Sequence, residues 1–371
     1  MSIRRWVAVC AAMIVAGTLF CGAAALQVDM PSRLAVDEGY DPQAQLPPGY
    51  VLTNAEPPAA ADDSGNGPDP LIDATSTPAA AAVAGASAPV QPSATPIPPT
   101  ATPIPAAALP PLPNTINFIL LGSDHRAGSS DWRTDTMVVV MVDPRNKQAG
   151  VISIPRDMFV NIPGRPPNRV NTLDEFGGPP LVKQVIGSLL GVPIDYYARV
   201  DFLNFEKAVN TIGGIDVSVD CTLRESNIVY PAGMTHMDGS AALLYARLRY
   251  STSVYDRMRR QSRVLWAIRE KLLSPAMFSR IPELWAAGQN MVQTDVPAQE
   301  AVSLAALAGA IKPADIHGMV VDYSMVRHAT SAQGWWILLP DLNHIRIAAH
   351  SIFSPGTPSF TDVSTKKASA C

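Results

Sequence analysis

The chain has 371 residues, with 28 Lys and Arg against 32 Asp and Glu and a formal net charge of −4 at pH 7. This slightly acidic balance argues against nucleic acid as the main partner. The length would ordinarily hold two globular domains, but the N-terminal third lacks the composition needed to form a core.

Residues 1–26 are predicted to be a short cytoplasmic tip and a transmembrane anchor. The run 6–26 contains no charged residue, and a helix of that length spans about 31 Å, close to the hydrocarbon core of a bilayer. Arg4 and Arg5 precede the run, so the N-terminus should lie inside and everything after the run outside. The alternative is a cleaved signal peptide, since the alanines at 23–25 suit a signal peptidase.

Residues 27–113 are predicted to form a disordered, Pro/Ala/Thr-rich extracytoplasmic stalk. Between positions 74 and 113 there is no charged residue, 11 of the 40 positions are proline, and the pentapeptide Ala-Thr-Pro-Ile-Pro occurs at 94–98 and at 101–105. Such a segment favours extended polyproline II structure rather than a core. The folded domain should therefore begin at Asn114.

Three apolar runs at 117–122, 136–142 and 150–154 predict strands of one sheet. The short turn at 143–147 makes the second and third strands antiparallel, because a short link cannot cross over to a parallel strand. If the first strand also pairs antiparallel with the second, five charged residues meet at one edge of the sheet: Asp124, Arg133, Asp135, Arg156 and Asp157. Carboxylates with guanidinium groups at such an edge suit a divalent cation that bridges a phosphate.

Two residues of this edge also have simpler interpretations. Asp157 is equally well explained as a cap of the turn after Pro155, and His125 is expected to face solvent.

Later segments alternate between the apolar spacing typical of helices and the apolar spacing typical of strands. Helices are predicted at 179–190, 202–211, 241–245, 258–272 and 297–311, the last capped by Thr294 or Asp295, and strands at 194–200, 215–219 and 317–322. The order indicates an α/β fold, a layered α-β-α domain with a mixed central sheet over residues 114–353. Residues 354–371 are predicted to be a disordered tail. The apolar stripes at 179–190 and 202–211 fit either the wall of a lipid tunnel or ordinary core, and core is the commoner case.

A basic cluster lies between positions 247 and 263. Arg247 and Arg249 have the period-two spacing that places both on one side of an extended segment. Arg257 and Gln261 share a face of the following helix. Because arginine is the fork-shaped donor for phosphate oxygens, Arg247, Arg249 and Arg257 predict an anion site. The other arginines are assigned to a solvated basic face: Arg259, Arg263 and Arg269.

Together these segments resemble the LytR–CpsA–Psr family of bacterial cell-wall enzymes, with core motifs over 114–272. The motifs, quoted from this chain, are Leu-Leu-Gly-Ser-Asp, Arg-Thr-Asp-Thr-Met, Ile-Ser-Ile-Pro-Arg-Asp, Arg169-Val-Asn, Phe176-Gly-Gly-Pro, Asp195-Tyr-Tyr, Gly213-Gly-Ile-Asp-Val, Tyr245-Ala-Arg-Leu-Arg and Arg257-x-x-Arg-Gln.

The resemblance implies an extracytoplasmic enzyme of cell-wall biogenesis. Such an enzyme transfers a phosphate-linked glycopolymer from an undecaprenyl-diphosphate carrier to peptidoglycan, binds the prenyl chain in a hydrophobic tunnel and uses magnesium, or manganese, at the diphosphate. Carried over by position, Asp124 and Asp135 resemble the metal-binding aspartates. The diphosphate-binding residues are then Arg133, Arg156, Arg169, Arg247, Arg249, Arg257 and Gln261.

One departure concerns the acid–base step. Many family members have an acidic residue three positions before Arg257, where this chain has Val254. Asp256 is a candidate replacement, either orienting Arg257 or accepting the acceptor's proton, and its alternative role is the helix N-cap. Two other functions stay open: a polyprenyl-diphosphate hydrolase acting on the same lipid, and a non-catalytic module that binds lipid or wall.

Overall fold

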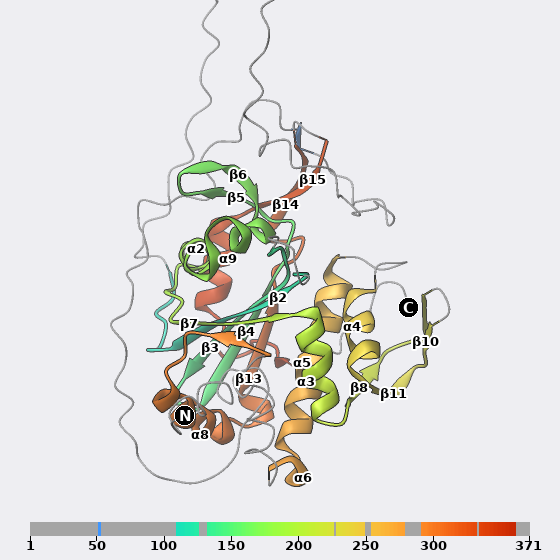
Figure 1. The fold of residues 1–371 in the computed structure, drawn as a ribbon. Helices are drawn as coiled ribbons and strands as arrows, with labels where there is room; N and C mark the ends of the chain where they lie inside the picture. Colours follow the sequence, from blue (N-terminus) through green and yellow to red (C-terminus); the bar gives the residue numbers. More distant parts are fainter. Residues whose placement is uncertain are drawn as a thin grey trace, which may run out of the picture. The chain divides into compact units, whose positions relative to one another are not determined.

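The computed structural model describes residues 51–52, 109–125, 132–225, 228–248, 254–278, 291–331 and 334–360 (Figure 1). The predicted membrane helix and most of the predicted stalk lie outside these residues. Among the helices that the structure describes, none combines the length and apolar character needed to cross a bilayer.

A six-stranded mixed sheet forms the centre of the domain. Its strand order is β12 (Gln293–Thr294), β7 (Tyr196–Asp201), β2 (Ile116–Ser123), β3 (Thr134–Asp143), β4 (Gln148–Ile154) and β13 (Ile316–Val320). β3 runs antiparallel to both β2 and β4, while β7 is parallel to β2 and β13 is parallel to β4. The antiparallel pairing of β3 with β4, predicted from the short turn, is therefore confirmed, and the condition that β2 also pairs antiparallel with β3 is met.

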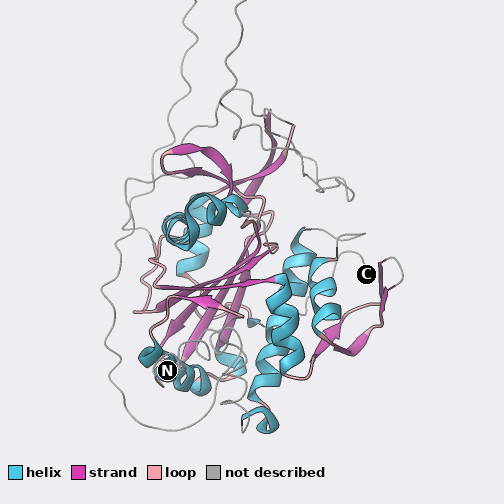
Figure 2. Ribbon diagram, in the orientation of Figure 1, coloured by secondary structure: helices cyan, strands magenta, loops and turns pink. Residues whose placement is uncertain are grey.

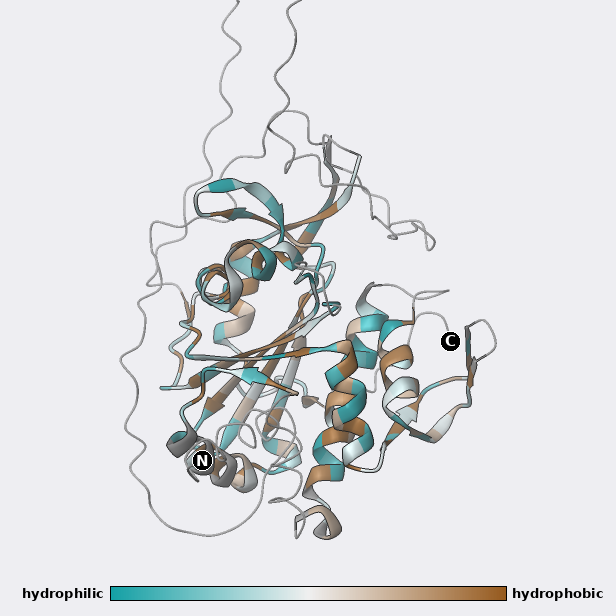
Figure 3. Ribbon diagram, viewed as in Figure 1, coloured by the Kyte–Doolittle hydropathy of each residue, from teal (hydrophilic) through white to brown (hydrophobic). Residues whose placement is uncertain are grey.

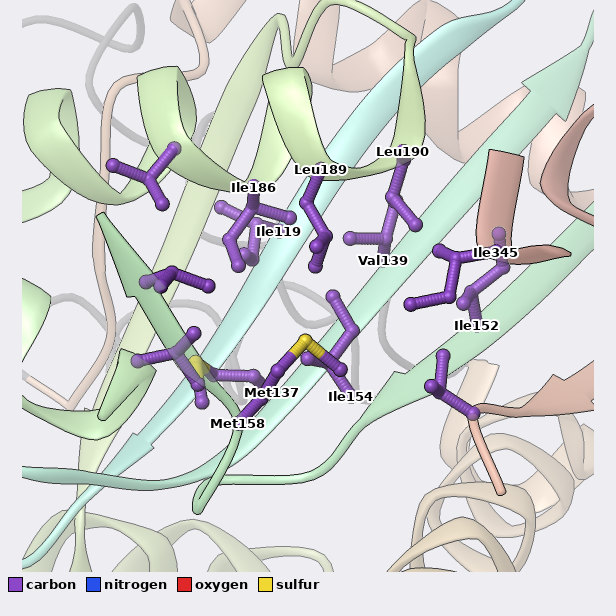
Figure 4. Packing of buried hydrophobic residues seen from close by; sticks show 14 of the residues in the cluster. Ile119, Met137, Val139, Ile152, Ile154, Met158, Ile186, Leu189, Leu190 and Ile345 are labelled. Atoms are coloured by element: carbon purple, nitrogen blue, oxygen red, sulfur yellow. The ribbon is translucent and has the colours of Figure 1, made fainter. Parts of the chain in front are cut away.

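Helices cover both faces of this sheet (Figure 2). On one face, α2 (Leu173–Leu190) and α9 (Leu342–His350) bury a cluster in which Ile186, Leu189 and Ile345 contact the sheet (Figure 4). On the other face lie α8 (Ala298–Ala310) and part of α5 (Val254–Leu273). The strands are buried on both sides, as their continuous apolar runs require. The predicted mixed α-β-α layering is therefore present in the described residues.

A second core joins three helices to a two-stranded sheet. The helices α3 (Phe202–Thr211), α4 (Gly239–Arg247) and α5 pack with β8 (Ile215–Val219) and β11 (Gly233–Met237). In Figure 3, α3 and α5 each carry hydrophilic and hydrophobic turns, as expected of helices with one buried face. Two glycines with φ of 78° and 77° follow the C-cap of α3, a conformation that glycine adopts without a Cβ clash.

Short elements complete the domain. They are β1 (Val51–Leu52), β5 (Phe159–Ile162), β6 (Arg165–Arg169), η3 (Val170–Thr172), β9 (Leu223–Glu225), β10 (Ile228–Tyr230), α6 (Pro275–Phe278), η4 (Pro313–Asp315), β14 (Val326–Thr330) and β15 (Trp336–Pro340). Two small antiparallel sheets are β5–β6 and β9–β10, and a third has the order β1-β14-β15. The strand β1 belongs to the segment assigned to the stalk, yet it pairs with Thr330 and Ala329 of β14.

Several sequence assignments need correction. Arg247 is the last residue of α4 and not part of an extended segment, while Arg249 lies outside the described residues. The N-cap of α8 is Pro297 rather than Thr294 or Asp295. Part of the predicted tail is folded, since Ser359 bridges to β13 and Phe360 is buried beside α5.

Candidate active site

The sheet directions bring five chain segments to one edge. β2, β7, β4 and β13 all end there, and antiparallel β3 begins there. Asp124 follows β2, and its backbone N–H donates to the carbonyl oxygen of Arg133 at 3.1 Å, which fixes it beside the start of β3. Arg156 and Asp157 follow β4, and Asp135 is the second residue of β3. The predicted meeting of these five residues at one sheet edge is thus present.

A cavity of about 170 Å³ opens near this edge, between the sheet and the helices α3, α4 and α5. Its walls are mostly apolar, and its lining includes Leu120, Ala198, Phe202, Phe205, Ala208, Val209, Ile212, Leu243, Ala246, Val264, Leu265, Ile268, Leu272 and Val292. The stripe at 202–211 therefore lines a cavity, the less common of the two alternatives that its pattern left open. The stripe at 179–190 does pack in the core, against the other face of the sheet.

The polar residues of the cavity wall include four that the sequence singled out, namely Asp135, Arg247, Arg257 and Gln261. They come from β3, from the end of α4 and from one face of α5. The guanidinium carbon of Arg247 lies 4.3 Å from the ring centroid of Phe202, a cation–π contact that holds the side chain against α3. An apolar cavity with guanidinium groups in its wall suits an amphiphile with an anionic head group.

Arginine side chains surround the carboxylate of Asp157. Its oxygens lie 3.7 Å from Arg156 Nε, 3.5 Å from Arg169 Nη1 and 3.9 Å from Arg257 Nη2. Arg156 also donates from Nη1 to Asp135 Oδ1 at 2.6 Å. We call Asp157, Arg156, Arg169 and Arg257 the Asp157 cluster. It joins Arg257 of the cavity wall to Asp135 through buried charges, so Asp157 does more than cap a turn.

The candidate metal ligands are two carboxylates. Asp124 and Asp135 lie at the same sheet edge and are both partly exposed. Arg133, between them in sequence, pairs through Nε with Glu175 of α2 at 3.6 Å. Within the described parts of the chain, no group of three or more His, Cys, Asp or Glu is arranged to hold a metal ion. The oxygen donors present suit magnesium or manganese, which need few protein carboxylates when phosphate oxygens complete the shell.

The C-terminal end of α4, which presents Arg247, is held by a buried arginine of α5. Arg260 is 2 % exposed and donates from Nε to the carbonyl oxygen of Tyr245 at 3.2 Å and from Nη2 to that of Leu248 at 2.5 Å. The first carbonyl belongs to the last turn of α4 and the second to its C-cap residue, and a cation at this end also interacts favourably with the helix dipole. Arg260 therefore fixes the backbone on both sides of Arg247.

Asp256 is neither the N-cap of α5 nor part of the cavity wall. It is the third residue of α5, so it is not the N-cap. Its carboxylate is fully buried and accepts from Arg259 Nη1 at 3.0 Å, and it is not among the residues that line the cavity. An acidic residue in the first turn still stabilises the helix through the dipole. Its role in acid–base chemistry stays a prediction.

The solvated basic face predicted for three arginines is wrong. Arg263 and Arg269 are 6 % and 7 % exposed, and their guanidinium groups pair with Asp220 and Glu270. Burial lowers the pKa of Arg269, and the Glu270 carboxylate partly offsets this effect. Arg259 is the partner of the buried Asp256 carboxylate.

Sequence reasoning missed a set of residues around Arg199. This β7 side chain lines the cavity, donates to Asp174 Oδ1 at 2.8 Å and stacks on the Trp132 ring with 3.8 Å to the centroid. The His125 ring also stacks on Trp132, with 3.8 Å between the ring centroids, and His125 is partly buried rather than fully exposed to solvent. Burial raises the pKa of the Asp174 carboxyl, and the Arg199 guanidinium partly offsets this shift. Only the parallel pairing of β7 with β2 brings Arg199 to this edge.

The chain matches a family model and several curated proteins. Residues 107–345 match the model of the LytR_cpsA_psr family. A polyisoprenyl-teichoic acid–peptidoglycan teichoic acid transferase, TagU, of Enterococcus faecalis is 33 % identical over 178 residues, which are 47 % of this chain and 58 % of TagU. The chain thus spans little more than half the length of this curated relative.

Two solved structures share the fold. The crystal structure of B. subtilis TagV superposes with a TM-score of 0.56 and 26 % identity, covering 65 % of this chain and 98 % of that chain. A structure of TagT bound to LI-WTA gives a TM-score of 0.52 and 25 % identity, covering 64 % of this chain and 90 % of that chain.

Proposed function

Since the chain belongs to the LytR–CpsA–Psr family, we propose that it transfers a phosphate-linked glycopolymer from a polyprenyl-diphosphate carrier to peptidoglycan. The main support is the apolar cavity with Asp135, Arg247, Arg257 and Gln261 in its wall. An apolar interior can hold a prenyl chain, and the guanidinium groups can hold the diphosphate beside the sheet edge. The E. faecalis relative is a teichoic acid transferase by name, which is the same class of reaction.

In this proposal the arginines bind and orient the diphosphate. Arg247 is fixed on Phe202, and Arg257 is fixed beside Asp157, so their donors are oriented before the substrate arrives. Phosphoryl transfer places negative charge on the transferring and leaving oxygens, and fixed cations stabilise this charge more than they stabilise the ground state. Lysine offers no matching fork of donors, so arginine is the better residue at these positions.

The acceptor hydroxyl attacks the phosphorus that carries the glycopolymer and loses its proton, while the bond from that phosphorus to the bridging diphosphate oxygen breaks and polyprenyl monophosphate leaves. Among the described residues that line the cavity, Asp135 and Asp201 are acidic, and Asp201 is engaged as the N-cap of α3. Asp157 is enclosed by arginines and Asp256 is fully buried. We therefore assign the general base to Asp135, with Arg156 orienting its carboxylate at 2.6 Å.

A magnesium or manganese ion is part of the proposal. Asp124 and Asp135 would hold it, and the ion would neutralise charge on the diphosphate oxygens. Both of these side chains are carboxylates, and carboxylate oxygens suit magnesium or manganese. We further propose that residues 6–26 anchor the protein in the cell membrane with the domain outside, as the sequence indicates.

The test uses the full-length protein in membrane vesicles with a lipid-linked glycopolymer labelled in its sugar, and isolated peptidoglycan as acceptor. The proposal expects label on the insoluble peptidoglycan with wild-type protein and background label with Asp135→Ala. Label released into solution instead would identify a diphosphate hydrolase. Binding of the lipid without any turnover would identify a non-catalytic module.

A further inference from the structure

A row of aromatic side chains lies beside the candidate active site. The ring centroids of Tyr255 and Tyr323 are 4.2 Å apart, those of Tyr323 and His328 are 5.0 Å apart, and those of His328 and Trp336 are 5.1 Å apart. These four residues, called here the aromatic row, come from α5, the segment after β13, and the strands β14 and β15. We propose that the aromatic row is a saccharide-binding subsite for the glycan strand of peptidoglycan, an inference that rests on the proposed function.

Backbone hydrogen bonds place this row against the Asp157 cluster. The N–H of Val321, two residues before Tyr323, donates to the Ser153 carbonyl oxygen at 3.0 Å, next to the end of β4. The N–H of Leu338 donates to the Asp157 carbonyl oxygen, also at 3.0 Å. At the other end of the row, Tyr255 lies two residues before Arg257 on α5.

The register of β14 and β15 turns their rings toward the same side. Thr330 pairs with Trp336 and His328 pairs with Leu338, so all four side chains share one face of this hairpin. That face includes Leu338, whose backbone binds Asp157. The opposite face holds Ala329, Ile337 and Leu339, which are buried in a separate apolar cluster.

Tyr323 is the exposed member of the row. It is 45 % exposed, whereas Tyr255 is 2 % exposed and His328 and Trp336 are partly buried. An exposed tyrosine ring supported by other rings is a rigid surface with a polar hydroxyl at its edge. A pyranose ring has the complementary form, because its C–H face is apolar and its hydroxyl groups surround that face.

Nearby charges favour a saccharide over the prenyl chain as the ligand. None of the four aromatic residues lines the apolar cavity. Tyr323 lies between Asp322 and the exposed Ser324, whose hydroxyl donates to Asp322 Oδ1 at 2.8 Å. Polar groups around a ring surface suit a ligand that also offers hydroxyl groups. The position next to the arginines would bring an acceptor hydroxyl within reach of the diphosphate.

The experiment measures equilibrium binding of muramidase-released N-acetylglucosaminyl–N-acetylmuramic acid fragments to the full-length protein in detergent micelles. We expect Tyr323→Ala to weaken binding by about five-fold or more, while Tyr323→Phe, which keeps the ring, stays within about two-fold. Met234→Ala is the matched control, because Met234 is 73 % exposed on β11 and belongs to a different sheet. Affinity for undecaprenyl diphosphate should be the same in all three variants.

A second arm titrates the lipid-free, phosphate-linked donor saccharide. If Tyr323→Ala weakens binding of the donor saccharide but not binding of the peptidoglycan fragments, the choice of ligand is overturned. Equal binding of the fragments by wild-type protein and Tyr323→Ala would overturn the subsite, and so would an absence of fragment binding by the wild type. If the fragments bind through Tyr323 but no label reaches peptidoglycan, the proposed function fails and the subsite stands.

Discussion

Replacing Asp157 by asparagine should destabilise the domain. The substitution keeps the size of the side chain and removes its charge from among Arg156, Arg169 and Arg257, at contact distances of 3.5 to 3.9 Å. The carboxylate side chain is 8 % exposed and the three arginine side chains are 8 %, 14 % and 12 % exposed. Solvent therefore screens the resulting repulsion poorly, and the guanidinium groups lose their shared counter-charge.

The magnitude follows from the geometry. Removing one partner of a buried ion pair typically costs about 3–5 kcal/mol. The contacts of Asp157 are longer than an ideal charged hydrogen bond, and Arg156 keeps its 2.6 Å bond to Asp135. The asparagine oxygen can also still accept a hydrogen bond. We therefore expect a loss of about 2–3 kcal/mol in the free energy of unfolding.

Thermal unfolding followed by tryptophan fluorescence measures this loss. For a folded domain of this size, the expected change lowers Tm by roughly 5–10 °C. The control is Asp216→Asn, whose carboxylate is 55 % exposed and pairs with an exposed His236, so its Tm should change by about 1 °C or less. A Tm for Asp157→Asn that matched the wild type would refute the idea that Asp157 balances the buried arginines.

Three further substitutions test the roles assigned at the site. Asp135→Ala should reduce the transfer rate at least about 100-fold and remove any response of that rate to added magnesium. If the variant kept metal-dependent turnover, Asp135 would be excluded as metal ligand and as general base. Arg247→Lys keeps the charge but loses the bidentate fork and weakens the contact with Phe202. KM for the lipid should therefore rise about ten-fold. An unchanged KM would contradict the role of Arg247 in binding the diphosphate. Asp256→Asn should leave kcat within about two-fold and lower Tm, because its buried carboxylate pairs with Arg259. A large fall in kcat at unchanged Tm would instead assign acid–base catalysis to Asp256.

Local patterns were enough to predict much of the fold. The apolar runs predicted the strands β2, β3 and β4, and the short turn at 143–147 predicted the antiparallel pairing of β3 with β4, because side-chain period and link length are local properties. The same reasoning brought Asp124, Asp135 and Arg156 to one edge. The helix 202–211 and the strand 215–219 were predicted at the residues where α3 and β8 lie. The short strands β5, β6, β14 and β15 were missed, because each has only four or five residues and no clear alternation.

Tertiary structure decided which charges are buried and what they touch. A helix pattern gives the face on which Arg263 lies, but the packing of α5 against β8 determines that this face is buried. Similarly, Arg199 reaches the cavity because β7 lies parallel to β2, and that pairing depends on the path of the chain through α2. Tyr255 and Tyr323, 68 positions apart in the sequence, come together because β13 is parallel to β4 and ends at the same edge. Contacts between distant segments depend on topology, and the period of one segment carries no information about its neighbours in space.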